Sequence, residues 1–204
     1  MKKKKSPTKL IVVTGGPGAG KTAVLEMARK AFCEQIAVLP EAASIVFGGG
    51  FWRKQTPAAK MAAQRAIYHV QRELERMVIE EGKVDLALCD RGTLDGLAYW
   101  PGTESAFFKG IETTREKELR HYCAVIHLRT PTEEIGYNHA NPLRIESPAE
   151  AAAIDKKIFH CWRGHPNRFI VDGALNFLDK AHRALELIRA EIEREKLLPM
   201  HRAL

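Results

Sequence analysis

Long hydrophobic runs are missing from this 204-residue sequence: none approaches the roughly 20 apolar residues that a helix needs to span a bilayer. No two of the four cysteines form a C-x-x-C pair, so we expect reduced thiols and no disulfide framework. The lysines at 2–5 are followed by the polar residues 6–9, where a secretory signal would continue with an apolar segment. These absences favour a cytoplasmic globular protein.

An excess of charge is also lacking outside the amino terminus. The formal net charge is +7, but four of the 32 basic residues are Lys2 to Lys5, and the other 28 nearly balance 25 acidic residues. Outside residues 2–5 the chain has too little excess positive charge for the basic surface that duplex-binding proteins have, so no duplex nucleic acid is expected as a partner. We interpret residues 1–8 as a disordered basic tail, with a membrane-surface or nucleic-acid tether through Lys2–Lys5 as the alternative. Residues 9–198 are expected to form a single domain, followed by a tail at 199–204.

The most informative feature that is present is a glycine-rich octet, which satisfies G-x-x-x-x-G-K-[ST] at every fixed position. It follows the apolar run 10–13, which predicts a buried parallel strand, and precedes the helical pattern 22–30. Glycines let backbone N–H groups turn inward onto a phosphate chain, and the helix N-terminus adds its positive dipole end. Lys21 would reach the β- and γ-phosphates, and the Thr22 hydroxyl would ligate Mg²⁺. The motif therefore predicts that a nucleoside triphosphate binds to Gly15, Gly16, Pro17, Gly18, Ala19, Gly20, Lys21 and Thr22.

The rest of the chain alternates between strand and helix patterns. Further strands are predicted at 36–39, 84–89, 123–128 and 168–171, and helices begin near Thr56 and Ser147. The apolar face expected for the helix after Thr56 consists of Ala63, Ile67, Val70, Leu74 and Met77. The pattern predicts an α/β fold: a P-loop NTPase with a five-stranded parallel sheet flanked by helices, nucleoside- or nucleotide-kinase-like, with a short helical lid at about 136–165. Right-handed crossovers bring the carboxyl ends of the strands to one edge, where the ligand is expected.

Two acids follow predicted strands at that edge. Asp90 ends an apolar strand, as a Walker B acid does, and would hold Mg²⁺ partly through water; the alternative is an N-cap for a helix near residues 95–100. Glu41 follows the second strand after Pro40, where a carboxylate could take the proton from an attacking hydroxyl. It could equally be a solvent-facing acid at a helix start. Both interpretations of Glu41 stay open at this point.

An arginine in the expected lid would complete a phosphoryl-transfer site. Arg144 lies between the fourth strand and the helix at Ser147, where it could neutralise charge on the transferred group; Arg129, Arg163 and Arg168 are weaker candidates. An Asn-Lys-x-Asp motif is absent, which disfavours a G-domain GTPase, and a Leu-Ser-Gly-Gly-Gln transporter signature is absent as well. Arg91 in place of a glutamate after Asp90 disfavours a ring-forming mechanical ATPase.

The combination of the P-loop, Pro40-Glu41, Gly48-Gly49-Gly50, Cys89-Asp90-Arg91-Gly92, Asp95 and Ala98-Tyr99-Trp100-Pro101 resembles a family of P-loop ATPase or kinase domains. The chain is similar to the kinase part of the bacterial nicotinamide riboside kinase regulator. It is also similar to a eukaryotic protein needed for translocation of a TRP-like channel, described as binding GTP and phosphoinositide. The resemblance covers roughly residues 9 to 192.

A more distant resemblance concerns two of these motifs. Pro40-Glu41 is similar to the strand-end glutamate that serves as base in deoxynucleoside kinases, and Asp90-Arg91 is similar to the acid–arginine pair of those enzymes and of thymidylate kinases. This resemblance implies that Arg91 faces the acceptor. The expected lid departs from the pattern, because residues 136–147 hold one arginine where many nucleoside kinases have several.

These observations lead to two hypotheses of function. The first is a phosphotransferase that uses ATP, with GTP as the alternative, and Mg²⁺ to phosphorylate a small nucleoside- or riboside-like metabolite. Lys21, Glu41, Asp90 and Arg144 would be its catalytic residues. Phe51 and Trp52 could stack on a flat acceptor ring or simply pack beside the glycine hinge. The second is a nucleotide-switched protein with slow hydrolysis that engages anionic lipid or a protein partner; a simple NTPase that acts with an unseen partner is a further alternative.

Overall fold

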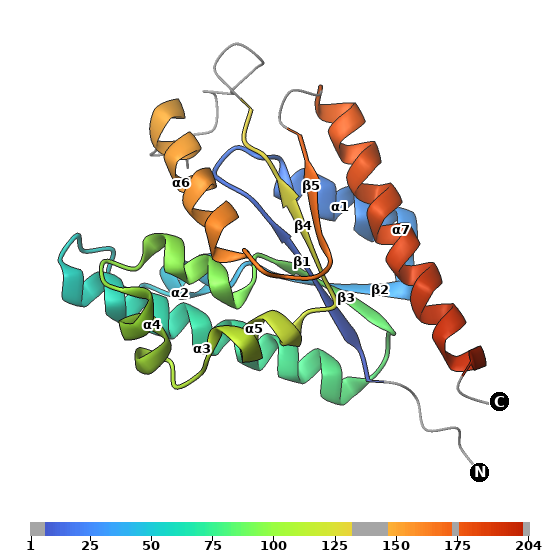
Figure 1. Cartoon of the computed structure of the whole chain (residues 1–204), viewed down its shortest axis with the longest axis horizontal. Helices are drawn as coiled ribbons and strands as arrows, with labels where there is room; N and C mark the ends of the chain where they lie inside the picture. The colour runs from blue at the N-terminus through green and yellow to red at the C-terminus, as the bar shows by residue number, and fades with distance from the viewer. Residues whose placement is uncertain (1–6, 132–146, 173–175, 202–204) are drawn as a thin grey trace.

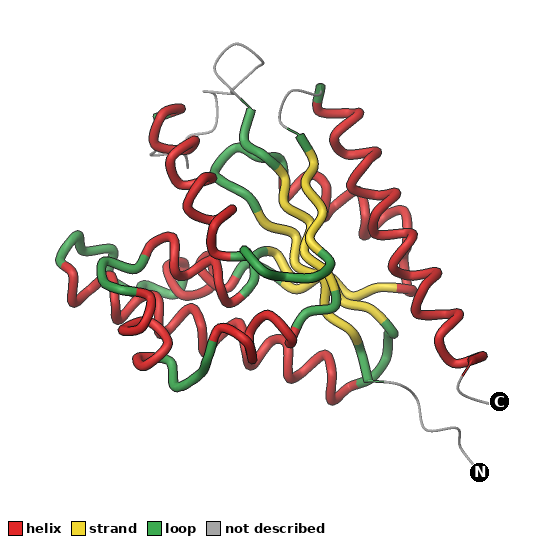
Figure 2. The backbone as a smooth tube through the Cα atoms, in the orientation of Figure 1, coloured by secondary structure: helices red, strands yellow, loops and turns green. Residues whose placement is uncertain are grey.

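The computed structural model describes residues 7–131, 147–172 and 176–201. Five strands form a wholly parallel sheet in the order β2-β3-β1-β4-β5 (Figures 1 and 2). The predicted fold class, an α/β fold with a five-stranded parallel sheet flanked by helices, is therefore confirmed. Among the described residues, no helix combines the length and the apolar character needed to cross a membrane.

The strands lie within one to two residues of the ranges expected from the sequence. They are β1 (Lys9–Thr14), β2 (Ile36–Leu39), β3 (Leu86–Asp90), β4 (Ala124–Leu128) and β5 (Arg168–Val171). The helices are α1 (Lys21–Phe32), α2 (Ala42–Gly48), α3 (Pro57–Glu81), α4 (Glu104–Gly110), α5 (Arg115–His121), α6 (Pro148–Cys161) and α7 (Phe177–His201). Two 3₁₀ segments, η1 (Cys33–Gln35) and η2 (Thr93–Tyr99), complete the order.

Each face of the sheet has its own apolar core. Alternate side chains of β1, such as Ile11 and Val13, pack with α1 and α7 on one face. The intervening Leu10 and Val12 pack with α3, η2 and α6 on the other. Burial on both faces explains why the strands have continuous apolar sequences without alternation.

The α3 helix differs from its expected orientation. Met77, assigned to the apolar face from its spacing, is 53% exposed, whereas Gln71 and Glu75 are buried. Glu75 is fully buried because it accepts hydrogen bonds from the Tyr122 hydroxyl at 2.7 Å and the Gln71 amide at 2.9 Å. The buried side of α3 is therefore partly polar. The apolar spacing predicted a buried face about a quarter-turn around the helix from the observed one.

Candidate functional site

The glycine-rich octet forms the turn between β1 and α1, as the sequence predicts. Gly15, Gly18 and Gly20 have positive φ angles of 140°, 76° and 91°, which L-residues with side chains rarely adopt. A Cβ on Gly15 would also lie 2.0 Å from the carbonyl oxygen of Leu128. The glycines are thus required both by the backbone conformation and by the close approach of β4.

The turn leads into a helix start without a side-chain cap. Gly20 is the N-cap residue of α1, and the first turn contains no acidic residue. The first N–H groups of a helix have no partner within the helix, and with its dipole they make a site for anions. The local structure therefore has the elements of a phosphate cradle.

Lys21 points back over this turn. Its Nζ donates to the carbonyl oxygens of Gly15 and Gly16, each at 2.9 Å, and the residue is 9% exposed. Burial lowers the pKa of Lys21 from 10.5 to about 7, with Arg91 acting in the same direction, while Asp90 and other nearby carboxylates oppose the shift. A bound triphosphate would raise the pKa of Lys21 again, because nearby negative charge favours the protonated form. The ammonium is therefore placed to bind an anion in the cradle.

Asp90 lies beside the beginning of the cradle. It is the last residue of β3, and the parallel register pairs it with Val13 of β1. Its Oδ1 is buried and has no hydrogen-bond partner among the described residues. Burial raises the pKa of Asp90 from 3.8 to about 6, although the Lys21 charge opposes this.

An orphaned carboxylate oxygen fits an Mg²⁺ site, because Mg²⁺ prefers oxygen ligands and usually retains waters. Thr22, at the start of α1, is exposed and offers a hydroxyl as the partner ligand expected from the motif. The alternative role of Asp90 as an N-cap is not seen, because η2 begins after Gly92.

Glu41 and Arg91 form an ion pair on the side of β3 away from β4. The Arg91 Nε donates to Glu41 Oε1 at 2.6 Å, and its Nη1 donates to the Gly15 carbonyl at 3.3 Å. Burial would raise the pKa of Glu41, but the Arg91 charge and the Ser44 hydroxyl outweigh it, so this pKa lies below its usual value. Glu41 is also the residue before α2, so both interpretations of its position are compatible with the structure.

Behind this pair, Asp95 joins three elements. Its Oδ2 accepts from the Thr14 hydroxyl at 2.5 Å, its Oδ1 accepts from the Trp162 Nε1 at 2.6 Å, and Arg91 Nη1 lies 3.6 Å from Oδ2. Asp95 and Trp162 are 2% and 0% exposed. These hydrogen bonds connect the end of β1 to η2 and to the residue after α6. They hold Asp95 in a fixed position next to Arg91.

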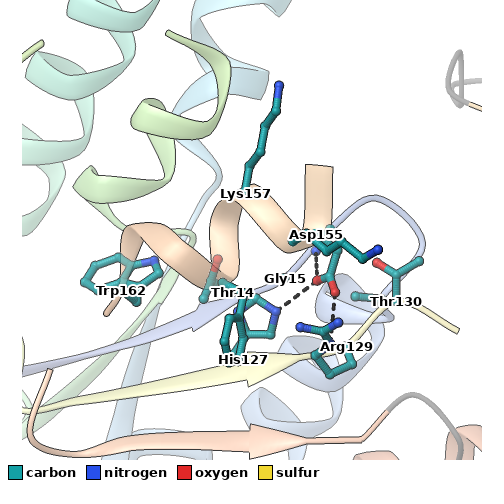
Figure 3. A network of polar contacts seen from close by, with 12 residues as sticks. Thr14, Gly15, His127, Arg129, Thr130, Asp155, Lys157 and Trp162 are labelled. Carbon is teal, nitrogen blue, oxygen red and sulfur yellow. Dashed lines mark hydrogen bonds and ion pairs between the residues drawn. The ribbon is translucent and has the colours of Figure 1, made fainter. Parts of the chain in front are cut away.

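The outer side of the turn is held by residues that sequence reasoning missed, apart from Arg129, which it considered only as a weaker candidate for the lid arginine. Asp155 of α6 accepts from the Gly16 N–H at 2.9 Å and from His127 Nε2 at 2.9 Å, and Arg129 Nε lies 3.1 Å from its other oxygen (Figure 3). Asp155 lies among apolar positions of α6, and an acid on an apolar helical stripe was the available signal. Two further hydrogen bonds hold the turn: Thr130 donates to the Pro17 carbonyl, and Lys180 donates to the Ala19 carbonyl.

The structure does not bring every predicted site residue to this edge. Phe51 and Trp52 are 38% and 71% exposed on the loop between α2 and α3 (Figure 1), where their ring contacts are with Phe47 and Lys54 of the same hairpin. Arg144 lies outside the described residues, as does all of the expected lid before Ser147. The remainder of the expected lid is largely α6, whose inner side is buried in the core.

A separate cavity of about 540 Å³ lies at the opposite edge of the sheet. Its lining includes Lys9, Cys123 and Asn167, which stand at or just before the amino ends of their strands, together with Arg194 of α7. No residue of the glycine-rich turn contributes to it. Ligands of open parallel sheets bind at the carboxyl ends of the strands, so we place the candidate site at the turn.

Comparison with known proteins identifies the family of the domain. The family model of an AAA domain matches residues 10–177, which comprise all five strands and the glycine-rich turn. No curated protein matches the chain.

Proposed function

The chain belongs to the AAA domain family, and from that premise we propose that it is an ATP–Mg²⁺-dependent phosphotransferase that acts on a hydroxyl group of a small metabolite. The observation that carries this proposal is the joining of Glu41 to the phosphate cradle through Arg91. A nucleotide-binding P-loop needs no second carboxylate of this kind for binding alone. A transferase needs one to orient its acceptor.

The nucleotide is held by the turn and by α1. The N–H groups at the start of α1 would contact phosphate oxygens, with the Lys21 ammonium exchanging its carbonyl partners for the β- and γ-phosphates. Thr22 and Asp90 would hold Mg²⁺, which neutralises charge on the phosphoryl oxygens when bound. ATP is proposed over GTP because the guanine-reading Asn-Lys-x-Asp motif is absent from the sequence.

The acceptor side is assigned to Glu41 and Arg91. The acceptor hydroxyl oxygen forms a bond to the γ-phosphorus while the bond from that phosphorus to the bridging oxygen breaks, and ADP leaves. The hydroxyl proton passes to a Glu41 carboxylate oxygen. A lowered pKa keeps this carboxylate ionised before the reaction, although it also makes it a weaker base. Arg91 contacts both Glu41 and the Gly15 carbonyl, so it fixes the acceptor base relative to the phosphates.

Three further residues complete the proposal. Arg144 would add positive charge at the transferred phosphoryl group, while Phe51 and Trp52 would stack on a flat acceptor ring such as a nucleobase or nicotinamide. Both rings are exposed on the loop between α2 and α3, away from the turn, so this part of the proposal requires that loop to approach the acceptor. The acceptor class is accordingly a nucleoside or related riboside.

The test measures ADP release from ATP and Mg²⁺ with and without a panel of nucleosides and ribosides. Acceptor-dependent ADP release, with one phosphorylated acceptor per ADP, is the expected result. Slow release that ignores every acceptor would overturn the proposal in favour of a nucleotide switch or an NTPase. The Lys21→Ala variant serves as the control for contaminating kinases, because it removes the phosphate-binding amine without disturbing the core.

A further inference from the structure

The contact between α6 and the second residue of the glycine-rich turn is built to exclude a side chain. A Cβ on Gly16 would lie 2.7 Å from the Asp155 Cβ and 2.5 Å from the Thr130 hydroxyl. Contacts this short do not occur between real side chains, so α6 reaches the turn only because position 16 is glycine. The approach brings the Asp155 Oδ1 to 2.9 Å from the Gly16 N–H.

The carboxylate at this contact is fully occupied. Asp155 is 2% exposed, and its Oδ1 accepts hydrogen bonds from Gly16 and His127, each at 2.9 Å. Its Oδ2 forms an ion pair with Arg129 Nε at 3.1 Å. An ionised carboxylate only accepts hydrogen bonds, so His127 donates from Nε2. Three donors converge on one carboxylate, and one of them belongs to the turn itself (Figure 3).

Through the peptide bond, this contact acts on the far side of the turn. The bond between Gly15 and Gly16 is trans and planar, so its N–H and its C=O point in opposite directions. The N–H points to Asp155. The C=O therefore points inward, where it accepts from Lys21 Nζ at 2.9 Å and from Arg91 Nη1 at 3.3 Å.

Nothing in the two glycines themselves selects this orientation. Glycine populates both signs of φ about equally, and a peptide between two glycines can rotate with little steric cost. A rotated peptide would present an N–H, in place of a carbonyl, to Lys21 and Arg91. External partners must choose one orientation: Lys21 and Arg91 bind the carbonyl, and Asp155 binds the N–H among the described residues.

We propose that Asp155 is a positioning residue for nucleotide binding: it fixes the Gly15–Gly16 peptide so that the Gly15 carbonyl aligns Lys21 and Arg91 for the triphosphate. The inference rests on nucleotide binding at the P-loop, as the proposed function does, but needs no acceptor. His127, in β4, and Arg129, directly after β4, hold the carboxylate in place. The α6 helix thereby becomes part of the nucleotide site without contacting the nucleotide.

The test compares the ATP–Mg²⁺ affinities of three variants by titration calorimetry. Asp155→Ala leaves the Gly16 N–H without its acceptor, and its ATP affinity should fall about tenfold or more. Asp155→Asn retains a carbonyl oxygen for Gly16 and should stay within about threefold of the parent. Ile158→Ala is the matched control: Ile158 is fully buried one turn further along α6, and its loss lowers the melting temperature while leaving ATP affinity unchanged.

Two results would overturn the proposal. One is equal loss of ATP affinity in Asp155→Ala and Ile158→Ala, which would show that general destabilisation is responsible. The other is an unchanged affinity in Asp155→Ala. If Asp155→Ala does not fold, the Gly16 amide in the unaltered protein decides: slow hydrogen exchange without nucleotide supports the proposal, and exchange at the rate of an open loop refutes it.

These outcomes are separate from those of the phosphotransferase proposal. Binding of ATP is measured without an acceptor, so a chain that binds ATP but transfers nothing can still show the Asp155 effect. Conversely, acceptor-dependent turnover with an unchanged affinity in Asp155→Ala would leave the phosphotransferase proposal standing and remove the role of Asp155.

Discussion

Replacing Glu41 with glutamine separates the function of this carboxylate from its contribution to folding. Glu41 and Arg91 lie 2.6 Å apart, with side chains 29% and 17% exposed. Removing one partner of a fully buried pair costs about 3–5 kcal/mol. Here the glutamine oxygen can still accept from Arg91, which also keeps Asp95 and the Gly15 carbonyl as partners. We therefore expect a loss of only about 1–2 kcal/mol in the free energy of unfolding.

The expected effect on catalysis is larger. Loss of a general base lowers turnover by about 10²–10⁴, which corresponds to about 3–5 kcal/mol in the activation free energy. A typical stability of 5–15 kcal/mol leaves the variant folded at 25 °C, so unfolding cannot account for such a decrease. ATP affinity should remain within a few-fold, because Glu41 reaches the turn only through Arg91.

The assay pairs calorimetric ATP affinity with acceptor-dependent turnover on the same preparation. Glu26→Gln is the matched control, because Glu26 is a 53% exposed side chain whose partner Arg29 lies 3.6 Å away on α1. It loses the same charge from the protein and should keep full turnover. Equal turnover in the parent and Glu41→Gln would remove Glu41 from the mechanism.

Three other predictions concern the cradle and its supports. Lys21→Ala should abolish measurable transfer and weaken ATP binding, with a modest fall in melting temperature because two hydrogen bonds to the turn are lost; unchanged binding in calorimetry would contradict the role of its ammonium. Asp90→Asn should lose Mg²⁺-dependent activity on the order of a hundredfold, without loss of melting temperature because Oδ1 has no partner to lose; an unaltered Mg²⁺ titration of activity would argue against it. Burial raises the pKa of Asp155, but the hydrogen bonds and charges of His127, Gly16 and Arg129 lower it by more, so the net pKa lies below 3.8. The stability advantage of the parent over Asp155→Asn should thus be complete above that pH and disappear as the pH falls through the folded-state value, which urea unfolding at several pH values would measure.

The sequence predicts much of the fold because the features involved are local. Each of the five strands is a short apolar run, and the turn at Gly15–Thr22 has a spacing that only a phosphate cradle requires. The neighbours of each strand could not be predicted in the same way. Pairing of β1 with β3 depends on contacts between residues some 77 positions apart, such as Val13 and Asp90.

The parts of the site that could not be predicted are polar contacts between distant segments. Asp155 reaches Gly16 across 139 residues, and Glu75 reaches Tyr122 across 47. A hydrophobic pattern predicts that an acidic residue is exposed, because it takes account of polarity but not of a hydrogen-bonding partner elsewhere in the chain. For the same reason the buried side of α3 was misplaced. The resemblance to kinase motifs implies that Arg91 faces an acceptor, which stays a prediction, and its ion pair with Glu41 is a contact between segments that the sequence alone did not predict.

The burial of Trp162 beneath the turn also gives the protein an internal optical reporter. This indole is 0% exposed and donates to Asp95, which in turn lies beside Arg91, whereas Trp52 is 71% exposed. Acrylamide added to the solvent quenches an exposed indole and spares a buried one. Emission that persists in its presence arises from the two buried indoles, Trp162 and Trp100. In a Trp100→Phe variant, a change in that emission on adding ATP would follow events at Arg91 without any attached dye.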